Sequence, residues 1–526
     1  MLNLLKSKKE WEHKLITTKP TSDSPNYPMR QLYSYIVVFM ASGCVLTIEI
    51  VAGRMLAPII GVSLYTWTSI IGIVLAGISL GNFLGGVIAD RFPYRYVLGL
   101  ILLASCLSSL SILPLIELVS EGFISFSVIS RIVVVTTIVF FLPSVMLGMV
   151  TPVVVKLRLN DLDKTGNIVG KLYAVSTAGS IFGTFITGFV LIQWMGTRSI
   201  VLTVTGLLLL LAIAFGRLYD MKIMLATFVL LLVGLGIITV KMEAFRTPCL
   251  IESSYFCIRI WEEESNGRTV SVLALDRLVH SYVDLDDPEF LAYGYEKVFA
   301  DLSAYVGENN PQFKSLFIGG GGYTMPRLIE NRYPESVIEV VEIDPAVTEV
   351  AYKYLAMPRN TRIITYNRDA RMMVQELKEE RYDLIIGDAF NHYSVPYHLT
   401  TLEFNEMVKA LLNEEGIYTV NVIDRLHSGR FLRAVSHTLE QSFDFVYIMH
   451  NRSDWSKDIR DTFVVAASDT PIALDKVNTG TSQNIKFTHK MPIDVYNSWI
   501  GAKKSILLTD AFVPVDNLLA PLFLEY

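Results

Sequence analysis

Long, nearly unbroken apolar runs fill the first half of the chain, whereas short apolar runs alternate with polar segments in the second half. An α-helix needs about 20 apolar residues to cross the hydrocarbon core of a bilayer. Seven segments before residue 242 meet this requirement, so the pattern predicts seven membrane-spanning helices. Their expected bounds are Leu32–Ala52, Thr66–Ile88, Val97–Ile116, Ile132–Val155, Leu172–Trp194, Ser199–Phe215 and Ile223–Val240.

Glycines recur every four residues in two of these segments. They stand at Gly77, Gly81 and Gly85 in the second segment and at Gly179 and Gly183 in the fifth. Small residues at this spacing let transmembrane helices approach each other closely. We therefore expect these glycines to serve helix packing rather than transport.

Glu49 is a carboxylate inside the first predicted span. A charged group within a membrane costs several kcal/mol unless it is paired, so such a residue is a functional candidate by default. Two interpretations remain open. Glu49 is either a functional membrane residue or a residue near the helix end that pairs with Arg54.

The second half of the chain begins with a predicted β-hairpin. Two alternating segments, Leu250–Trp261 and Thr269–Leu275, flank Asn266-Gly267. Asn-Gly between alternating segments is a strong hairpin signal, because both residues tolerate the positive φ angles of a tight turn. The next segment, Asp287–Tyr305, has the pattern of a helix. A small β-rich cap followed by a helix is therefore expected.

From Ser315 onwards, predicted strands and helices alternate. Such alternation predicts a mainly parallel, doubly wound sheet that binds ligands at the carboxyl ends of its strands. The expected strands are Ser315–Ile318, Val337–Val341, Thr361–Thr365, Tyr382–Gly387, Gly416–Val422, Phe445–Met449 and Thr462–Ala467, and the expected helices include Ala370–Glu379, Thr401–Leu412 and Arg430–Ser442.

Composition supports the membrane assignment and excludes one class of partner. Hydrophobic residues make up 52% of the chain and charged residues 18%, an apolar excess that soluble enzymes of this length rarely show. The formal net charge is −6, and no basic patch is interleaved with aromatic residues. We therefore expect no nucleic-acid partner.

Basic residues indicate the orientation of the spans, because loops rich in Lys and Arg stay on the cytoplasmic side. The seventh span then delivers the C-terminal half to the outside, where Cys249 and Cys257 have the opportunity to form a disulfide. Nucleoside cofactors are cytosolic, however, so the sequence leaves the side open. The basic segments that fall on one side are the tail over residues 1–31, Asp90–Tyr96, Lys156–Lys171 and Gly216–Lys222.

The stretch Lys314–Asp344 carries the clearest chemical signal. A strand runs into the glycines Gly319–Gly322, a helix-like segment follows, and Glu342 ends the next strand about 20 residues further on. Glycines let the backbone pass close to a ligand, and a carboxylate can accept both hydroxyls of a ribose. No Gly-Lys-Ser/Thr follows, so a nucleoside without a pyrophosphate fits best. A plain βα turn with an acid at the surface is the alternative.

Acids follow three predicted strand ends, at Glu342, Asp369 and Asp388. They are expected to surround one crevice, because the carboxyl ends of parallel strands meet at one edge of the sheet. Glu342 then holds ribose, Asp369 accepts the exocyclic amine of adenine, and Asp388 faces the reacting centre. Each acid taken alone is also compatible with a loop residue or helix cap, Asp369 before Ala370 in particular. The aromatic loop after Asp388 is a candidate lid.

The second half resembles the spermidine synthase family of aminopropyltransferases. The matching stretches are LFIGGGGYTMPRLIE, VVEIDPAVTEVAYKYL, NRDAR, YDLIIGDAF and HLTTLEF. The chain is most similar to a membrane-fused branch, in which such a domain follows a transmembrane region similar to half a major-facilitator transporter. The resemblance implies a sulfonium donor, either decarboxylated S-adenosylmethionine or S-adenosylmethionine itself, and no metal. It implies that Asp388 binds and deprotonates the attacking amine. The implied donor-binding residues are Gly319, Gly320, Gly321, Glu342, Asp369 and Ala370.

The amine half of the implied site departs from the family pattern. Gly322 stands where the family's glycine run ends in an aspartate, and Asn391 stands where a second acid follows the catalytic one. Two lost carboxylates weaken the case for a dicationic acceptor, because each buried ammonium group needs a paired acid. Tyr293 and Tyr295 match the cap's Tyr-His-Glu signature only loosely, and His280 replaces a glutamine. The expected substrate-binding residues are His280, Tyr293, Tyr295, Asn391 and Tyr393.

These observations predict a multi-domain fold: an N-terminal all-α transmembrane bundle of about seven helices, a small β-rich cap and a Rossmann-like α/β domain of the methyltransferase type. The expected divisions are a flexible cytoplasmic tail (1–31), the transmembrane domain (32–241), the cap with its hairpin and helix (242–312) and the donor-binding transferase domain (313–526). We expect a multi-pass protein of the cell inner membrane, with the lipid bilayer and a small-molecule amine as partners. The resemblance adds a homodimer formed through the cap.

The leading hypothesis is a membrane-anchored, spermidine synthase-like transferase of polyamine chemistry. It moves an aminopropyl or other alkyl group from the sulfonium donor to an amine acceptor. A second hypothesis is a transporter or sensor whose C-terminal domain binds a nucleoside or polyamine without turnover, for which Glu49 and the glycine-rich spans argue. A third is methylation from S-adenosylmethionine on the same fold.

Overall fold

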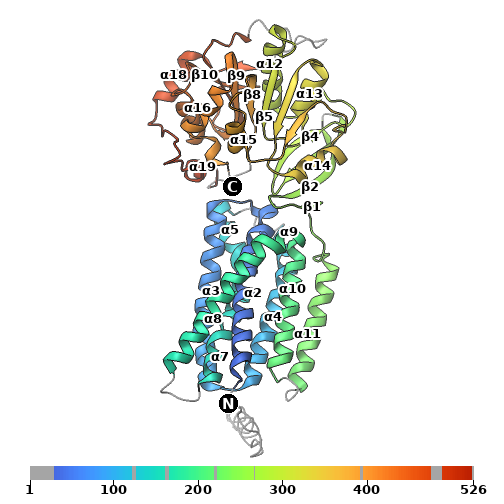
Figure 1. Cartoon of the computed structure of the whole chain (residues 1–526), viewed down its shortest axis with the longest axis vertical. Coiled ribbons are helices and arrows are strands. Elements are labelled where there is room, and N and C mark those ends of the chain that lie inside the picture. The colour runs from blue at the N-terminus through green and yellow to red at the C-terminus, as the bar shows by residue number, and fades with distance from the viewer. Residues whose placement is uncertain are drawn as a thin grey trace, which may run out of the picture.

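The computed structural model describes residues 29–120, 126–159, 165–217, 222–265, 267–390, 395–474 and 488–523. It consists of a bundle of long helices and an α/β part that sits on one end of the bundle (Figure 1). The first described residues lie at the other end of the bundle. The chain therefore enters and leaves the bundle at opposite ends.

Seven helices, or runs of helices, in the described residues are long and apolar enough to cross a membrane. Each contains one of the seven expected segments and extends beyond it, so the prediction of seven spans is confirmed. They are α2 (Gln31–Ile60), α3 (Leu64–Arg91), α4 (Arg95–Ser120), the run α5 (Val128–Thr136), η1 (Thr137–Phe141), α6 (Leu142–Gly148) and α7 (Val150–Arg158), the run α8 (Thr165–Ile186), η3 (Thr187–Leu191) and α9 (Ile192–Trp194), then α10 (Thr197–Phe215) and α11 (Lys222–Lys241).

Glycines hold two pairs of these helices close together. A Cβ atom added to Gly81 of α3 would lie 2.2 Å from the carbonyl oxygen of Val145 in α6. One added to Gly179 of α8 would lie 2.1 Å from the carbonyl oxygen of Phe39 in α2. A larger residue at either position would push the helices apart, because the close-packed interior leaves no room for it. The expected packing role of these glycines is confirmed.

The cap is an antiparallel meander in the order β1-β2-β3-β4. Ser265 pairs with Arg268 at the expected hairpin. The first hairpin strand begins at Cys257 and not at Leu250, because the chain turns back on itself between Ser253 and Phe256, where Ser253 N donates to Phe256 O at 2.9 Å. The strands are β1 (Ile251–Glu252), β2 (Cys257–Ser265), β3 (Arg268–Leu275) and β4 (Leu278–Val283).

A disulfide joins Cys249 to Cys257 across this turn. It ties the segment that leaves the membrane bundle to the first residue of β2, so the cap begins at a fixed point. The helix that follows the cap, α12 (Gly294–Asn309), starts later than the expected Asp287. Its start is set by a capping box, in which Tyr293 N donates to the Glu296 carboxylate at 3.1 Å.

The larger sheet has the strand order β12-β10-β11-β9-β8-β5-β6-β7 in the described residues. Strands β5 to β9 run parallel to one another, and β10 to β12 add an antiparallel edge, so the mainly parallel sheet is confirmed. The strands are β5 (Lys314–Ile318), β6 (Val337–Val341), β7 (Ile364–Tyr366), β8 (Tyr382–Gly387), β9 (Leu412–Arg425), β10 (Phe445–His450), β11 (Arg460–Ser468) and β12 (His489–Lys490).

One strand starts later than the pattern predicts. Strand β7 begins at Ile364 and not at Thr361, because the Glu330 carboxylate takes up this part of the chain. It accepts hydrogen bonds from Thr361 Oγ1 at 2.8 Å and from Arg362 N at 2.6 Å, so these groups are not available to a neighbouring strand.

Helices cover both faces of the larger sheet, which confirms the doubly wound arrangement. Leu316 and Ile318 of β5 point into one apolar core, and Phe317 between them points into the other. This alternation follows from the two-residue period of a strand. The first core contains α15 (Ala370–Glu376), α16 (Leu402–Ala410), α17 (Phe431–Leu439), α18 (Ile493–Gly501) and α19 (Val515–Phe523); the second contains α12, α13 (Thr324–Arg332) and α14 (Pro345–Tyr354).

The glycine contacts predict an effect on stability. Gly81→Ala should lower the free energy of unfolding by about 1–3 kcal/mol, because the added methyl group overpacks the α3–α6 contact. The matched control is Gly86→Ala in the same helix, where an added Cβ meets no atom within 4 Å. Thermal unfolding of both variants in detergent checks this expectation. Equal destabilisation by both substitutions would contradict it.

Candidate functional site

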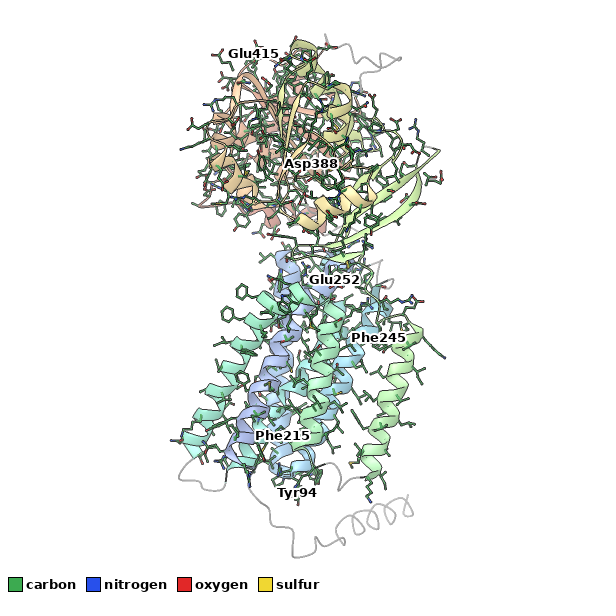
Figure 2. The ribbon with its side chains drawn as sticks, turned by 45° about the vertical axis from the view of Figure 1, so that its right-hand side comes forward. Tyr94, Phe215, Phe245, Glu252, Asp388 and Glu415 are labelled. Atoms are coloured by element: carbon green, nitrogen blue, oxygen red, sulfur yellow. A yellow bond between two sulfur atoms is a disulfide. The ribbon has the colours of Figure 1, made fainter. Side chains whose placement is uncertain are left out.

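A cavity of about 420 Å³ opens at the carboxyl ends of β5, β6 and β8, between the larger sheet and the cap. This volume lies in the range of small-molecule sites. Figure 2 shows Asp388, one of its lining residues, inside the α/β part and well away from the junction with the bundle at Glu252. The sequence-predicted residues brought together here are His280, Tyr293, Tyr295, Gly319, Gly320, Gly321, Glu342, Asp369, Ala370 and Asp388.

The glycine turn that follows β5 lies against the backbone of β8. Gly319 has a φ of +105°, and a Cβ there would lie 2.4 Å from the carbonyl oxygen of Asp388. Only glycine fits this position, because a side chain would strain the backbone at this φ angle and would also collide with the carbonyl group. Tyr323 then starts α13 with a φ of 55°, a left-handed conformation that is rare for a bulky residue. Its buried hydroxyl group exchanges a hydrogen bond with Thr348 of α14 at 3.0 Å, which holds this conformation.

Glu342 ends β6 with its carboxylate against the glycine turn. One oxygen accepts a hydrogen bond from Gly320 N at 2.8 Å, and the other accepts one from Asp344 N at 3.0 Å. Burial raises the pKa of Glu342, and these backbone donors lower it in part. Each carboxylate oxygen has two acceptor sites. The backbone of Gly321 also hydrogen-bonds to this carboxylate, so at least one of its acceptor sites remains for a ligand hydroxyl group.

Asp369 was expected either to bind a ligand or to cap a helix, and its position in the structure is compatible with both roles. One of its oxygens accepts from Met372 N at 3.1 Å, so the residue caps α15. The other lies 3.4 Å from Nε2 of His398, in the short helix η5 (Tyr397–Leu399). Both Asp369 and His398 line the cavity. The capping role does not therefore exclude a binding role.

Asp388 follows β8 directly, and its carboxyl group is buried in the cavity. Burial raises its pKa to about 7. Nδ2 of Asn421 in β9 donates to one carboxylate oxygen at 2.5 Å, and the Tyr295 hydroxyl group lies 3.5 Å from the other. A carboxyl group in this state exchanges protons close to neutral pH.

A second buried carboxyl group, Glu296, lies on the cap side of the same cavity. Burial raises its pKa to about 8, although the bond from Tyr293 N acts in the opposite direction. The Tyr293 hydroxyl group donates to Val279 O at 2.9 Å, and its ring contacts that of Tyr295 at a centroid distance of 5.4 Å. The two tyrosines therefore form an aromatic wall beside the two acids.

His280 of β4 lies between two backbone carbonyl groups. Its Nδ1 is 3.0 Å from Leu278 O, and its Nε2 is 3.0 Å from Phe390 O. Burial lowers the pKa of His280, and the two carbonyl groups raise it. A neutral imidazole can donate to only one of these oxygens. His280 thus connects the cap to the loop that follows Asp388.

The absence of an acid at Gly322 has a structural reason. Its N–H group donates to Ser281 Oγ at 2.9 Å, and an added Cβ would lie only 2.6 Å from Ser281 Cβ. The cap strand β4 therefore occupies the space that a side chain at position 322 needs. Ser281 was not expected from the sequence, because only the packing of the cap on the turn brings the two residues together.

Two buried polar atoms in the cavity lining lack a partner in the described part of the chain: Thr324 Oγ1 and Asn421 Oδ1. Buried polar groups are nearly always hydrogen-bonded, so each is a position where a ligand donor or acceptor fits. Sequence reasoning missed Asn421. The available signal was a single amide inside the apolar strand segment IYTVNV.

Three further candidate residues are not among those that line the cavity in the described structure: two lie outside the described residues, and Glu49 was expected in the membrane part. Asn391 and Tyr393 lie outside the described residues. Glu49 lies in α2, and among the described residues it forms no ion pair. Arg54, the partner considered for it, instead donates to the carbonyl oxygen of Tyr255 at 2.7 Å. The functional role of Glu49 stays a prediction.

Comparison with known proteins agrees with this geometry. The family model described as "Spermine/spermidine synthase domain" matches residues 295–449. A polyamine aminopropyltransferase of Vibrio vulnificus is 36% identical over 142 residues, which cover 26% of this chain and 46% of that protein. A probable polyamine aminopropyl transferase of Bifidobacterium longum is 32% identical over 108 residues, which cover 20% of this chain and 24% of that protein. The chain thus spans less than half the length of these two curated relatives.

Among solved structures, a probable spermidine synthase from Corynebacterium glutamicum is similar, with a TM-score of 0.41 and 20% identity. The match covers 48% of this chain and 93% of that structure. The likeness of the membrane helices to a transporter stays a prediction. Residues 295–449 thus match the model of the spermine/spermidine synthase domain, and in the described part of the chain seven long apolar helices precede them.

Proposed function

We propose that this protein is a membrane-anchored transferase that moves an aminopropyl group from decarboxylated S-adenosylmethionine to an amine acceptor. The observation that carries the proposal is the position of Asp388. This buried carboxyl group, whose pKa is raised to about 7, lines the same cavity as the glycine turn and Glu342. The family domain and its aminopropyltransferase relatives support the reaction type.

The donor half of the cavity suits a nucleoside. Glu342 retains at least one acceptor position for a ribose hydroxyl group. Asp369 has one oxygen that is not used to cap α15, which suits the exocyclic amine of adenine. The backbone of Gly319–Gly321 lines the same space without side chains. These residues hold the donor so that its reactive carbon faces Asp388.

Asp388 would act on the acceptor in two ways. Its negative charge attracts the ammonium form of the amine, and it then takes one proton from that group. The freed nitrogen lone pair attacks the carbon next to the sulfonium sulfur. A carbon–nitrogen bond forms as the carbon–sulfur bond breaks, and the electron pair stays on sulfur, which leaves as a neutral thioether. Asn421 fixes the carboxylate and offers its unpartnered Oδ1 to the acceptor.

The charge in the acceptor half favours an acceptor with one ammonium group near the reacting centre. At neutral pH the Glu296 carboxyl group is largely protonated, because burial raises its pKa to about 8. Position 322 offers no acid, since Ser281 fills the space. Asp461 also lines the cavity, but its carboxylate pairs with His450 at 3.3 Å and with Arg452 at 3.2 Å. Asp388 has no such cationic partner among the described residues, so it is the acid left to attract the ammonium group. The donor actually consumed decides between aminopropyl transfer and the alternative of methylation from S-adenosylmethionine.

The first prediction concerns turnover. Wild-type protein incubated with decarboxylated S-adenosylmethionine and a panel of amines should yield an aminopropylated amine and methylthioadenosine, detected by mass spectrometry. Asp388→Asn should lower kcat/KM at least about a hundredfold, because the base is lost. Glu415→Gln, an exposed carboxyl group on the outer side of the same part (Figure 2), is the control and should change nothing. Turnover by Asp388→Asn at the wild-type rate would refute the assignment.

The second prediction concerns pH. Asp388 accepts a proton only when it is ionised, and burial raises its pKa from 3.8 to about 7. The value of kcat/KM should therefore rise as the pH rises through about 7, whereas an ordinary aspartate would already be ionised over this range. A profile that stays flat between about pH 5 and pH 8 would exclude Asp388 as the base.

The proposal also includes a side of the membrane. Basic residues gather at the end of the bundle away from the α/β part: Arg91 and Arg95 flank the α3–α4 connection, and Lys156, Arg158 and Lys222 lie at helix ends on the same side. Loops of this kind remain cytoplasmic. The disulfide lies at the opposite end, as expected for an oxidising compartment. The catalytic domain then lies outside the cytoplasm, and its substrates must be present there.

The third prediction tests this side. In right-side-out membrane vesicles, added protease should digest the C-terminal half and spare a tag on the N-terminus. Cys249 and Cys257 should react with maleimide only after reduction. The buried Cys44 and Cys106 provide an internal reference that reacts only on unfolding. Protection of the C-terminal half in sealed vesicles would place the domain in the cytoplasm and leave the proposed reaction unaffected.

A further inference from the structure

A second cavity, of about 290 Å³, lies at the junction between the membrane bundle and the cap. Its walls come from the ends of α2, α4 and α10, from the segment around the disulfide, and from β2 and the β3–β4 turn. Ser120 is the last residue of α4, and Thr197 is the first of α10. The cavity therefore lies at the level where the helices leave the membrane.

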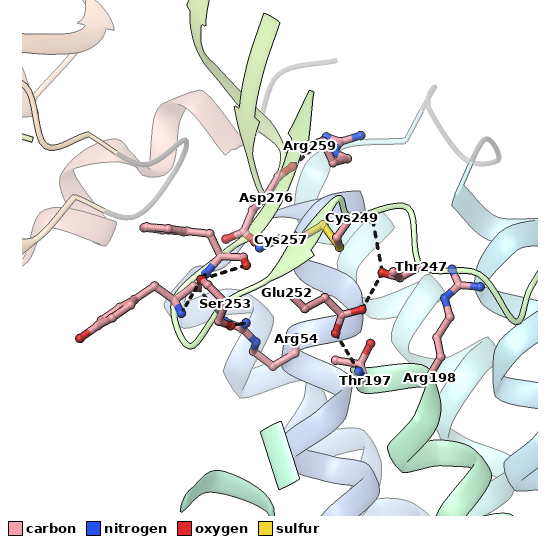
Figure 3. Close-up of a disulfide and its surroundings, with 12 residues drawn as sticks. Arg54, Thr197, Arg198, Thr247, Cys249, Glu252, Ser253, Cys257, Arg259 and Asp276 are labelled. Atoms are coloured by element: carbon pink, nitrogen blue, oxygen red, sulfur yellow. Dashed lines mark hydrogen bonds between the residues drawn. A yellow bond between two sulfur atoms is a disulfide. The ribbon is translucent and has the colours of Figure 1, made fainter. Parts of the chain in front are cut away.

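Four arginines and two glutamates line this cavity: Arg54, Arg198, Arg259, Arg277, Glu117 and Glu252. Both glutamates are engaged within the protein. Glu117 forms an ion pair with Arg198. Glu252 accepts from Thr197 N at 2.7 Å and from the Thr247 hydroxyl group at 2.6 Å (Figure 3). An excess of positive charge therefore remains in the cavity lining.

The hydrogen bonds of Arg54 and Arg259 go to backbone carbonyl groups. Arg54 donates to Tyr255 O at 2.7 Å. Arg259 donates to Asp276 O at 2.7 Å (Figure 3). Arg277 Nη1 is buried and has no hydrogen-bond partner among the described residues, and the same is true of Arg259 Nε. Burial lowers the pKa of Arg259, and the charge of Asp276 raises it in part.

A buried guanidinium nitrogen without an acceptor is costly, so Arg277 Nη1 and Arg259 Nε indicate a position for a missing acceptor. Arginine presents a planar set of donors that matches the oxygens of a phosphate group. Met55, Ile59 and Ile116 supply an apolar wall beside the arginines. The arginines and the apolar wall of this cavity, together with its place at the ends of the helices, thus suit a phosphate ester at the membrane surface.

We propose that this arginine-lined cavity binds a phosphate group, carried either by the headgroup of an anionic phospholipid or by a soluble phosphate ester. The bound anion would neutralise Arg259 and Arg277 and hold the cap against the bundle. The site is separate from the cavity around Asp388, and it does not depend on the proposed transferase reaction.

Native mass spectrometry of delipidated full-length protein in a neutral detergent tests the proposal. The probes are dioleoylphosphatidylglycerol, dioleoylphosphatidylcholine and glycerol 3-phosphate, each titrated separately. Wild-type protein should retain one phosphatidylglycerol in preference to phosphatidylcholine if a lipid is the source. Retention of glycerol 3-phosphate with equal affinity would identify a soluble ester instead. Binding of neither anionic probe would overturn the proposal.

Arg277→Gln should weaken binding about tenfold or more, because a charge-assisted hydrogen bond is lost. Arg277→Lys keeps the charge without the planar set of donors and should weaken binding less. The unfolding temperature of each variant, measured without a probe, shows whether it folds. If Arg277→Gln does not fold, the affinity of Arg277→Lys is compared with that of wild-type protein instead. The matched control is Arg246→Gln, an exposed arginine of the same junction that pairs with Glu243 outside the cavity. Equal affinity of wild-type protein and the Arg277 variants would refute the site.

Discussion

The contact between the Glu342 carboxylate and the glycine turn is the interaction on which the rest of the cavity around Asp388 depends. A buried carboxylate is costly unless backbone groups bond to it, and here Gly320 N and Asp344 N do so. These bonds fix the end of β6 against the turn that follows β5. Gly319 in turn lies against the carbonyl group of Asp388. The carboxyl ends of β5, β6 and β8 are thus held against one another at this point.

The same strand end is connected to the membrane bundle. Asp344 caps α14 and also bonds to the Ser253 hydroxyl group, and the carbonyl group of Ser253 accepts from Arg54 of α2. The disulfide fixes the neighbouring part of this segment. The bundle therefore does more than anchor the domain. Its outer end positions the chain segment that supports Glu342, and the arginine-lined cavity lies beside this same segment.

The sequence by itself determined the features that depend on local patterning. Seven apolar runs of sufficient length define the spans, because helix length and bilayer thickness are fixed by the backbone and the lipid. Alternating strands and helices define a mainly parallel sheet, and its topology requires Glu342, Asp369 and Asp388 to meet at one edge. The four-residue spacing of the close-packed glycines was also visible in the sequence, whereas the pairing of Cys249 with Cys257 was left open there.

Only the tertiary structure decided the surroundings of Asp388 and Gly322. Asn421 reaches Asp388 across 33 residues, and Ser281 reaches Gly322 across 41. Neither pair has a local signature, since each depends on which strand lies beside which and how the cap packs on the turn. The pKa of Asp388 follows from burial, which the sequence cannot supply. The sequence gives the order of the charged residues, but electrostatic energies depend on their distances and desolvation, and these exist only in the folded chain.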